Sequence, residues 1–361
     1  MGFTSTTSDR PRQTWNGFLS SRLTGPIGIS AVSFVQHRTA NPIITPYCSV
    51  KGRGEAFGRQ FITQNPRFSV QMLRPSRFTS LALGIASGIA TLTATAAVAL
   101  QVQVTPSNPR LGDTLSVVIQ TDKVSGEAPT VSMQQQTYPT FAVGSNQFRA
   151  LLPTTPLDQP GTWQIRVTGD GQEKNLTVQV GRRTFPTQRI RIRSSASGGM
   201  EPTQHELDRV RAFRQIVSPE KFWSGPFLAP NRGRVSTVYG VRRYYNGVFA
   251  KDYFHRGIDY AGGQGSPVFA PAAGRVALVG RVSEGFRLHG NIIGIDHGQG
   301  VTSVFMHLSR IDVREGDFVQ PGQVIGAVGS TGASTGPHLH WGLYVHGKSV
   351  DPIPWRTQGI E

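Results

Sequence analysis

The sequence predicts a mainly β protein with one short helix. Apolar and polar residues alternate with a period of two in many short runs, which is the pattern of half-buried strands. The 361 residues include 42 Gly and 24 Pro, many of them between these runs, where turns are expected. A clear helical spacing of apolar residues occurs once, near residue 210.

The first hundred residues are expected to lie outside the folded part. Residues 1–71 are rich in Ser, Thr, Arg, Gly and Pro without sustained periodicity, so we expect no stable structure there. Residues 72–99 have a basic start, an apolar middle and an Ala97-Val98-Ala99 end, the pattern of a secretory signal peptide. Because signal peptides begin at the initiator methionine, we interpret Met72 as the native start and residues 1–71 as an upstream extension.

A membrane anchor is the alternative for this segment. Residues 78–100 carry no charge and are long enough to span a bilayer. The Ala-x-Ala end and the moderate hydrophobicity favour cleavage. On either interpretation we expect an exported protein, in the periplasm or cell envelope.

Residues 100–185 predict an immunoglobulin-like β-sandwich without a disulfide. About seven short strands separated by turn clusters are typical of such a domain. We expect it to be a spacer or packing module; binding to the cell wall or to a partner, or covering an active site, is the alternative. The clearest alternating runs are 102–104, 115–119, 148–152, 163–167 and 176–180.

Residues 186–230 are expected to be a linker that contains the helix. Thr203 and Glu206 have the spacing of a capping box, in which each side chain bonds the other residue's backbone. An apolar stripe follows at helical spacing and is expected to pack on the next domain. The stripe consists of Leu207, Val210, Phe213 and Ile216.

Charge and cysteine usage narrow the function classes. The formal net charge is +16, and about half of the excess lies in residues 1–77. A basic chain suggests nucleic acid, but no recognised nucleic-acid motif is present, so we expect no nucleic-acid partner. A moderate positive charge also suits an anionic cell wall. The single cysteine, Cys48, precedes the predicted globular part, which excludes a thiol nucleophile there.

Three short segments of residues 231–361 supply four His and one Asp. Residues i and i+2 of a strand point to the same face, so His338 and His340 are expected side by side. His255 and Asp259 lie four apart around a glycine, and His307 lies between these segments in sequence. A hydrolytic zinc site needs three protein ligands and leaves its fourth position to water. Two His and one Asp meet that requirement.

These motifs, in this order, resemble the lysostaphin/LytM-type zinc metallopeptidases, which cut peptide bonds in bacterial peptidoglycan. The likeness covers residues 234–355, roughly a third of the chain. It implies that residues 231–361 form an antiparallel β catalytic domain, with hairpins that also resemble those of lipoyl carriers. The chain departs from the family at Met306 and at Leu288-His289-Gly290-Asn291, where Tyr-Gly-Asn is frequent.

The resemblance implies a role for each site residue. His255, Asp259 and His340 would hold one Zn²⁺, and His307 and His338 would act on the water and the oxyanion. The implied function is an exported zinc metallo-endopeptidase that hydrolyses peptide cross-links of peptidoglycan during cell-wall remodelling. One alternative is a non-catalytic wall-binding activator of amidases, as in relatives that have lost zinc ligands. A structural zinc site is the other alternative.

Overall fold

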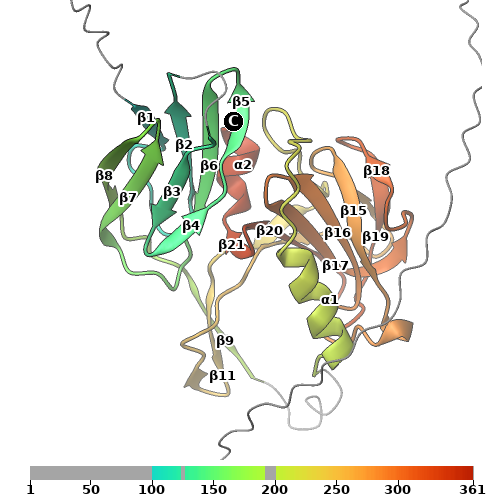
Figure 1. Cartoon of the computed structure of the whole chain (residues 1–361). Coiled ribbons are helices and arrows are strands. Elements are labelled where there is room, and N and C mark those ends of the chain that lie inside the picture. Colours follow the sequence, from blue (N-terminus) through green and yellow to red (C-terminus); the bar gives the residue numbers. More distant parts are fainter. Residues whose placement is uncertain (1–99, 123–126, 192–200, 361) are drawn as a thin grey trace, which may run out of the picture. The chain divides into compact units, whose positions relative to one another are not determined.

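The structure is a computed structural model that describes residues 100–122, 127–191 and 201–360. This part is mainly β, with two α-helices (Figure 1), which confirms the predicted fold class. The proposed extension and the signal or anchor segment, residues 1–71 and 72–99, lie outside the described residues. Within the described part, neither helix is long and apolar enough to cross a membrane.

Residues 100–122 and 127–181 form a sandwich of two antiparallel sheets. Its strands are β1 Gln101–Thr105, β2 Thr114–Gln120, β3 Thr130–Met133, β4 Gln136–Tyr138, β5 Phe141–Gly144, β6 Gln147–Pro153, β7 Gly161–Gly169 and β8 Gln172–Val180. The strand orders are β1-β2-β6-β5 and β4-β3-β7-β8. Alternate residues of β7 are buried, as its pattern predicts. Residues of both sheets share one apolar core, which includes Leu115, Val117, Val131 and Ile165.

The linker region contains a helix and part of a small sheet. Helix α1 spans Gln204–Arg214 and begins at Thr203, whose hydroxyl accepts a hydrogen bond from the Glu206 backbone N–H. Strand β9, Thr187–Ile190, pairs in parallel with β11, Arg242–Tyr245, and β11 pairs with β12, Val248–Phe249.

The predicted apolar stripe of α1 was wrong at one position. Leu207 is 37% exposed, and the buried residues of the helix are Glu206, Val210 and Phe213. A carboxylate therefore occupies the inward position nearest the start of the helix. The side chain of Glu206 also differs from the predicted capping box, because it bonds a distant loop.

A ten-stranded sheet makes up the C-terminal part. Its strands are β10 Arg234–Thr237, β13 Ile258–Ala261, β14 Pro267–Phe269, β15 Gly274–Gly280, β16 Asn291–Gly298, β17 Val301–Ile311, β18 Phe318–Val319, β19 Val324–Val328, β20 Leu339–Val345 and β21 Lys348–Val350. The main path is β10-β13-β20-β17-β16-β15-β18, and its pairings are antiparallel. Beside it lie a 3₁₀ turn, η2 Val282–Glu284, and helix α2, Pro352–Thr357. Every residue of β20 is buried, so the sheet centre is rigid.

Helix α1 covers part of this sheet (Figure 1). Val210 and Phe213 join a separate apolar cluster with residues of β15, β16, β17 and β20. Gly294 of β16 lies under the Phe213 ring, where an added Cβ would come within 2.6 Å of ring carbons. The helix is therefore seated on the sheet by close packing.

Buried polar contacts also join the sandwich to the C-terminal sheet and its helix. Asp351, the N-cap of α2, accepts a hydrogen bond from Arg183 at 2.6 Å, and its backbone N–H donates to the Gly112 carbonyl at 2.8 Å. Trp355 Nε1 donates to Thr114 Oγ1 at 3.3 Å. The described residues belong to one compact unit.

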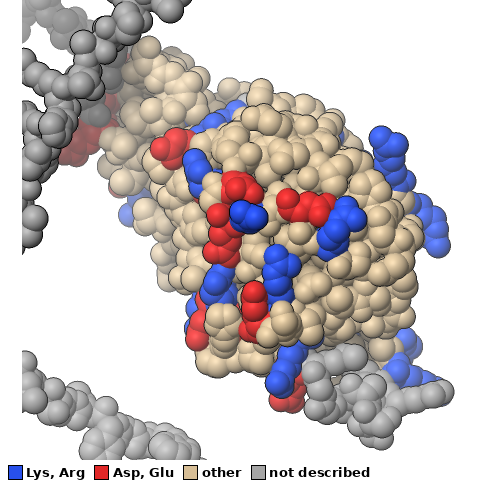
Figure 2. Space-filling model, turned by 90° about the vertical axis from the view of Figure 1, so that its right-hand side faces the viewer, with Lys and Arg blue, Asp and Glu red and all other residues tan. Residues whose placement is uncertain are grey.

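Charged side chains are mixed on the face shown in Figure 2, where acidic and basic groups lie interspersed among uncharged ones. Within the described residues, opposite charges also pair at the surface, as in Arg310–Asp312 and Arg211–Asp208. Positive charge is therefore not gathered into one stripe on this face.

We expect Phe213→Ala to lower the free energy of unfolding by about 3–5 kcal/mol, because it opens a cavity between α1 and the sheet. Leu207→Ala, on the exposed side of the same helix, should change it by less than about 1 kcal/mol. Urea unfolding of both variants measures this difference. Equal losses would contradict the packing of α1.

Candidate metal centre

Strand register places two of the predicted site residues opposite each other. Asp259 of β13 pairs directly with His340 of β20. Opposite residues of an antiparallel pair project from the same face of the sheet, with their Cβ atoms about 4.5–5.5 Å apart. His255 lies in the segment that leads into β13, and its backbone N–H donates to the Val241 carbonyl at 2.9 Å. All three side chains are buried.

The three side chains converge on one point. His255 Nε2 lies 3.0 Å from Asp259 Oδ1 and 3.0 Å from His340 Nδ1. His340 Nδ1 lies 2.9 Å from the same carboxylate oxygen. Ligand atoms of a tetrahedral zinc ion, at about 2.0–2.1 Å from the metal, are about 3.3 Å apart. The observed triangle is close to that size.

Hydrogen bonding fixes which atom His255 presents. Its Nδ1 lies 2.9 Å from the Val238 carbonyl oxygen, which only accepts, so the ring proton is on Nδ1. The Nε2 lone pair therefore faces the Asp259 carboxylate and the His340 imidazole. A divalent cation stabilises such a meeting of electron-rich atoms, and one carboxylate with two imidazoles is a donor set that zinc prefers. The residues present thus fit a zinc ion.

The ionisation states suit metal binding. Burial acts to raise the pKa of Asp259, but the neighbouring imidazoles of His255 and His340 outweigh burial and hold this pKa well below its ordinary value. Burial lowers the pKa of His340 to about 4. Near neutral pH the carboxyl is therefore ionised and the His340 imidazole neutral, which are the forms that bind metals.

Gly257 lets the two strands approach at this site. A Cβ at this position would lie 2.3 Å from the Trp341 carbonyl oxygen and 2.8 Å from His340 Nε2. Only glycine leaves that space open, because real side chains do not show such contacts. Glycine is thus required between His255 and Asp259 because any side chain there would collide with β20 and with the His340 ring.

His307 and His338 lie beside this cluster. The His307 ring centroid is 4.8 Å from that of His338 and 6.4 Å from that of His340. His307 Nδ1 donates to the Thr331 carbonyl at 2.8 Å, and His338 Nδ1 donates to the Gly336 carbonyl at 2.8 Å. Both rings therefore keep their Nε2 lone pairs free to accept a proton. Burial lowers the pKa of His307 to about 3.

The backbone of His307 is in an unusual conformation. Its φ is +65°, in the left-handed region that a residue with a side chain seldom adopts. Strand β17 also has an irregular register between Leu308 and Arg310. Strain of this kind persists only where the surroundings hold the residue in place. The fold thus turns the His307 side chain toward the cluster at an energetic cost.

The structure brings all five predicted site residues together. Two other histidines are not part of this group of five. His297 is buried within β16 and bonds Ser303 Oγ at 2.9 Å, so it belongs to the core. His289 does lie in a loop, but it is buried against Glu206. Sequence reasoning missed this contact, because 83 residues separate the partners.

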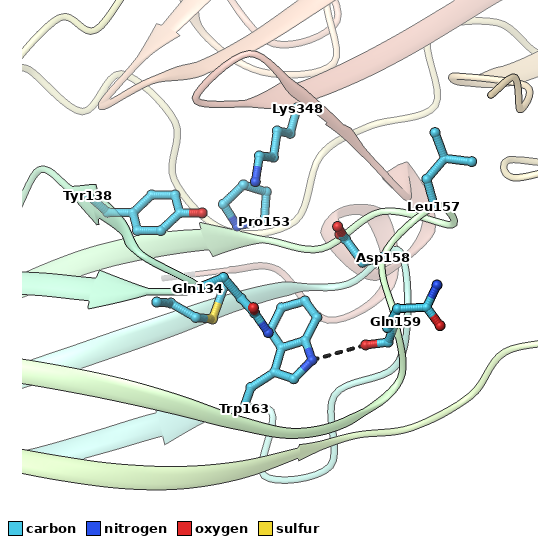
Figure 3. A pocket seen from close by; sticks show the side chains of 9 residues that line it. Gln134, Tyr138, Pro153, Leu157, Asp158, Gln159, Trp163 and Lys348 are labelled. Atoms are coloured by element: carbon cyan, nitrogen blue, oxygen red, sulfur yellow. Dashed lines mark hydrogen bonds between the residues drawn. The ribbon is translucent and has the colours of Figure 1, made fainter.

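A cavity of about 290 Å³ opens at a different place, against the sandwich (Figure 3). Lys348 and Asp158 line it with the rings of Tyr138 and Trp163. These rings are only 2% and 6% exposed, and Trp163 Nε1 donates to the Gln159 carbonyl. They pack in the sandwich core, and none of the five site residues lines this cavity.

The fold and the site are those of a metallopeptidase-type domain: an antiparallel β-sheet carries a buried His-Asp-His cluster with two imidazoles beside it. Residues 253–352 match Peptidase family M23, and this range includes all five site residues. The chain therefore contains a peptidase M23 domain of the LytM/lysostaphin family.

Relatives and a solved structure agree with this assignment. The chain is 42% identical over 120 residues to the DD-carboxypeptidase/endopeptidase Mpg of Neisseria meningitidis, covering 33% of this chain and 26% of Mpg. It is 36% identical over 123 residues to the peptidoglycan DD-endopeptidase ShyA of Vibrio cholerae, covering 34% and 27%. The chain thus spans about a quarter of the length of these relatives.

The crystal structure of a proposed M23 peptidase from Pseudomonas aeruginosa is 26% identical, with a TM-score of 0.52. That match covers 70% of this chain and 96% of the other. The likeness in structure therefore extends beyond the M23 segment.

We expect Zn²⁺ to raise the melting temperature of the chelator-treated protein, because a ligand that binds only the folded state stabilises it, by about 2.7 kcal/mol at a hundredfold excess over Kd. Asp259→Asn should abolish most of this rise, since it removes the charged ligand. His205→Ala, a histidine on the exposed side of α1, serves as the control. Stabilisation of Asp259→Asn equal to that of the wild type would contradict the assignment of the cluster.

Proposed function

We propose that this chain is a zinc metallo-endopeptidase that hydrolyses peptide cross-links of bacterial peptidoglycan and acts outside the cytoplasm in cell-wall remodelling. One observation carries the proposal. The triangle formed by His255, Asp259 and His340 lies beside two imidazoles, His307 and His338, whose Nδ1 atoms are both tied to backbone carbonyls. A site that only held a structural metal would have no need of this second pair.

The chemistry follows from these positions. His255, Asp259 and His340 would hold a zinc ion, which would supply Lewis acidity for activating a water molecule and polarising the scissile carbonyl. His307 and His338 divide the proton transfer and the hydrogen bonding to the developing oxyanion between them, because each keeps Nε2 available. Their fixed ring orientation means that little reorganisation is needed during the reaction.

The substrate assignment rests on similarity. ShyA, which resembles this chain over the M23 segment, is a peptidoglycan DD-endopeptidase, and Mpg is a DD-carboxypeptidase/endopeptidase. We therefore propose a cross-link that involves a D-amino acid. The proposal of export rests on the signal-like pattern of residues 72–99 and on this substrate, which lies outside the cytoplasm.

Incubation of the purified protein with cross-linked peptidoglycan is expected to convert cross-linked fragments into uncross-linked ones. A zinc chelator should stop the reaction, and added Zn²⁺ should restore it. Mass spectrometry of the fragments identifies the bond. Cleavage that persists after the metal is removed, or no loss of cross-links with the metal bound, would contradict the proposal.

We expect His307→Ala and His338→Ala each to keep the zinc content of the wild type and to lower the cleavage rate by about 10²–10⁴-fold, the usual contribution of a positioned acid or base. Metal analysis and single-turnover assays measure the two quantities. If both variants bind zinc and cleave at the wild-type rate, the assignment of His307 and His338 as the catalytic pair is wrong. If the wild type binds the wall and activates an amidase without cleaving, the non-catalytic alternative is correct.

A further inference from the structure

A carboxylate from outside the matched family segment is buried in the M23 domain. Glu206 of α1 has an exposed fraction of 0%, and it lies 47 residues before the segment 253–352. Its oxygens accept hydrogen bonds from the backbone N–H groups of Arg287 and His289 at 2.9 and 2.7 Å. The Leu288 N–H, at 3.1 Å, also donates to this carboxylate.

A fourth contact completes this arrangement. His289 Nδ1 lies 2.6 Å from Glu206 Oε1, and Thr203 Oγ1, at the start of the same helix, donates to the Gly285 carbonyl at 2.9 Å. Three successive backbone N–H groups and one imidazole thus surround one carboxylate. Burial acts to raise the Glu206 pKa, but these hydrogen bonds outweigh it and bring the pKa to about 2. The side chain is therefore ionised at any pH where the protein would work.

The loop that Glu206 holds is bonded in turn to His307. The His289 carbonyl accepts a hydrogen bond from the His307 backbone N–H at 3.1 Å. His307 is the residue with the strained left-handed backbone, and its ring is fixed by the Thr331 carbonyl. The loop thus supplies the acceptor for the His307 backbone N–H, and Thr331 holds the His307 carbonyl and ring.

The same loop also holds the segment that leads to His338. The Leu288 carbonyl accepts a hydrogen bond from the Ala333 N–H at 2.9 Å, and the next residue, Ser334, contacts His338 Nδ1 at 3.2 Å. The peptide group between Leu288 and His289 therefore donates to Glu206 on one side and accepts from Ala333 on the other. The Glu206 carboxylate thus fixes a loop that is hydrogen-bonded both to His307 and to the turn before His338.

We propose that Glu206 is a positioning residue for the hydrolytic reaction, an inference that rests on the proposed function. Its carboxylate is delivered by α1 and orders residues 287–289, which hold His307 and the turn before His338 in their working positions. The metal ligands His255, Asp259 and His340 make no contact with this loop among the described hydrogen bonds. Loss of Glu206 should therefore affect the rate and leave the metal in place.

The test compares Glu206→Gln with Asp208→Asn, which changes an exposed carboxyl on the same helix. We expect Glu206→Gln to lower kcat by about tenfold or more, the usual effect of losing such a supporting contact. Its KM and zinc content should stay close to the wild-type values, and Asp208→Asn should behave as the wild type. A purely structural role would instead lower zinc content and melting temperature together with the rate.

Amide hydrogen exchange provides a readout that does not depend on activity. In the wild type, the amides of Leu288, His289 and His307 should exchange slowly, and in Glu206→Gln they should exchange faster, while those of β20 remain unchanged. Fast exchange of these amides in the wild type, or an unchanged kcat in a folded Glu206→Gln, would overturn the proposal. The wild-type measurement decides the matter even where the variant does not fold. If the wild type cleaves nothing but these amides respond as stated, the proposed function fails and the ordering of the loop by Glu206 stands.

Discussion

The structure depends on keeping three electron-rich atoms at one buried point. A carboxylate and two imidazoles within about 3 Å of one another repel or compete unless a positive charge is shared between them. The sheet resists this tendency with a rigid frame, because Asp259 and His340 lie on paired strands and every residue of β20 is buried. Folding therefore builds an arrangement that is unfavourable by itself and becomes favourable when a cation enters.

The second pair of imidazoles is held by different means. His255, Asp259 and His340 are placed by a strand pairing and its approach. His307 lies instead near an irregular point of β17, and His338 lies just before β20. The rings of both depend on carbonyl acceptors, from Thr331 and Gly336. Turns have fewer buried contacts than central strands and open more easily. Support from outside the sheet, as Glu206 gives to residues 287–289, compensates for this weakness. For the proposed function, firmly placed metal ligands and a supported pair of imidazoles would provide the preorganisation that catalysis requires.

Those parts of the fold and of the site that depend on local sequence patterns could be predicted from the sequence. The alternation in β7 is a local pattern, and it is present in the structure. The predicted strand at His340 is also present, as β20, and His338 lies directly before it. Strands β3, β4 and β5 have only three or four residues each, too few to show a period. Leu207 was expected to be buried because hydrophobicity favours the inward face of a helix. The inward face of the first turn instead carries the Glu206 carboxylate, which bonds the amides of the loop. No local pattern reveals a partner that lies 80 residues away.

The register between β13 and β20 has a consequence for how faithfully the chain folds. Side chains of a strand alternate between its two faces, so a slip of one residue would turn Asp259 or His340 to the opposite side of the sheet. The slipped form would lose the ligand set, and with it the free energy of metal binding, which is available only to the folded site. Metal binding would thus stabilise the correct register of β13 and β20 relative to a register shifted by one residue.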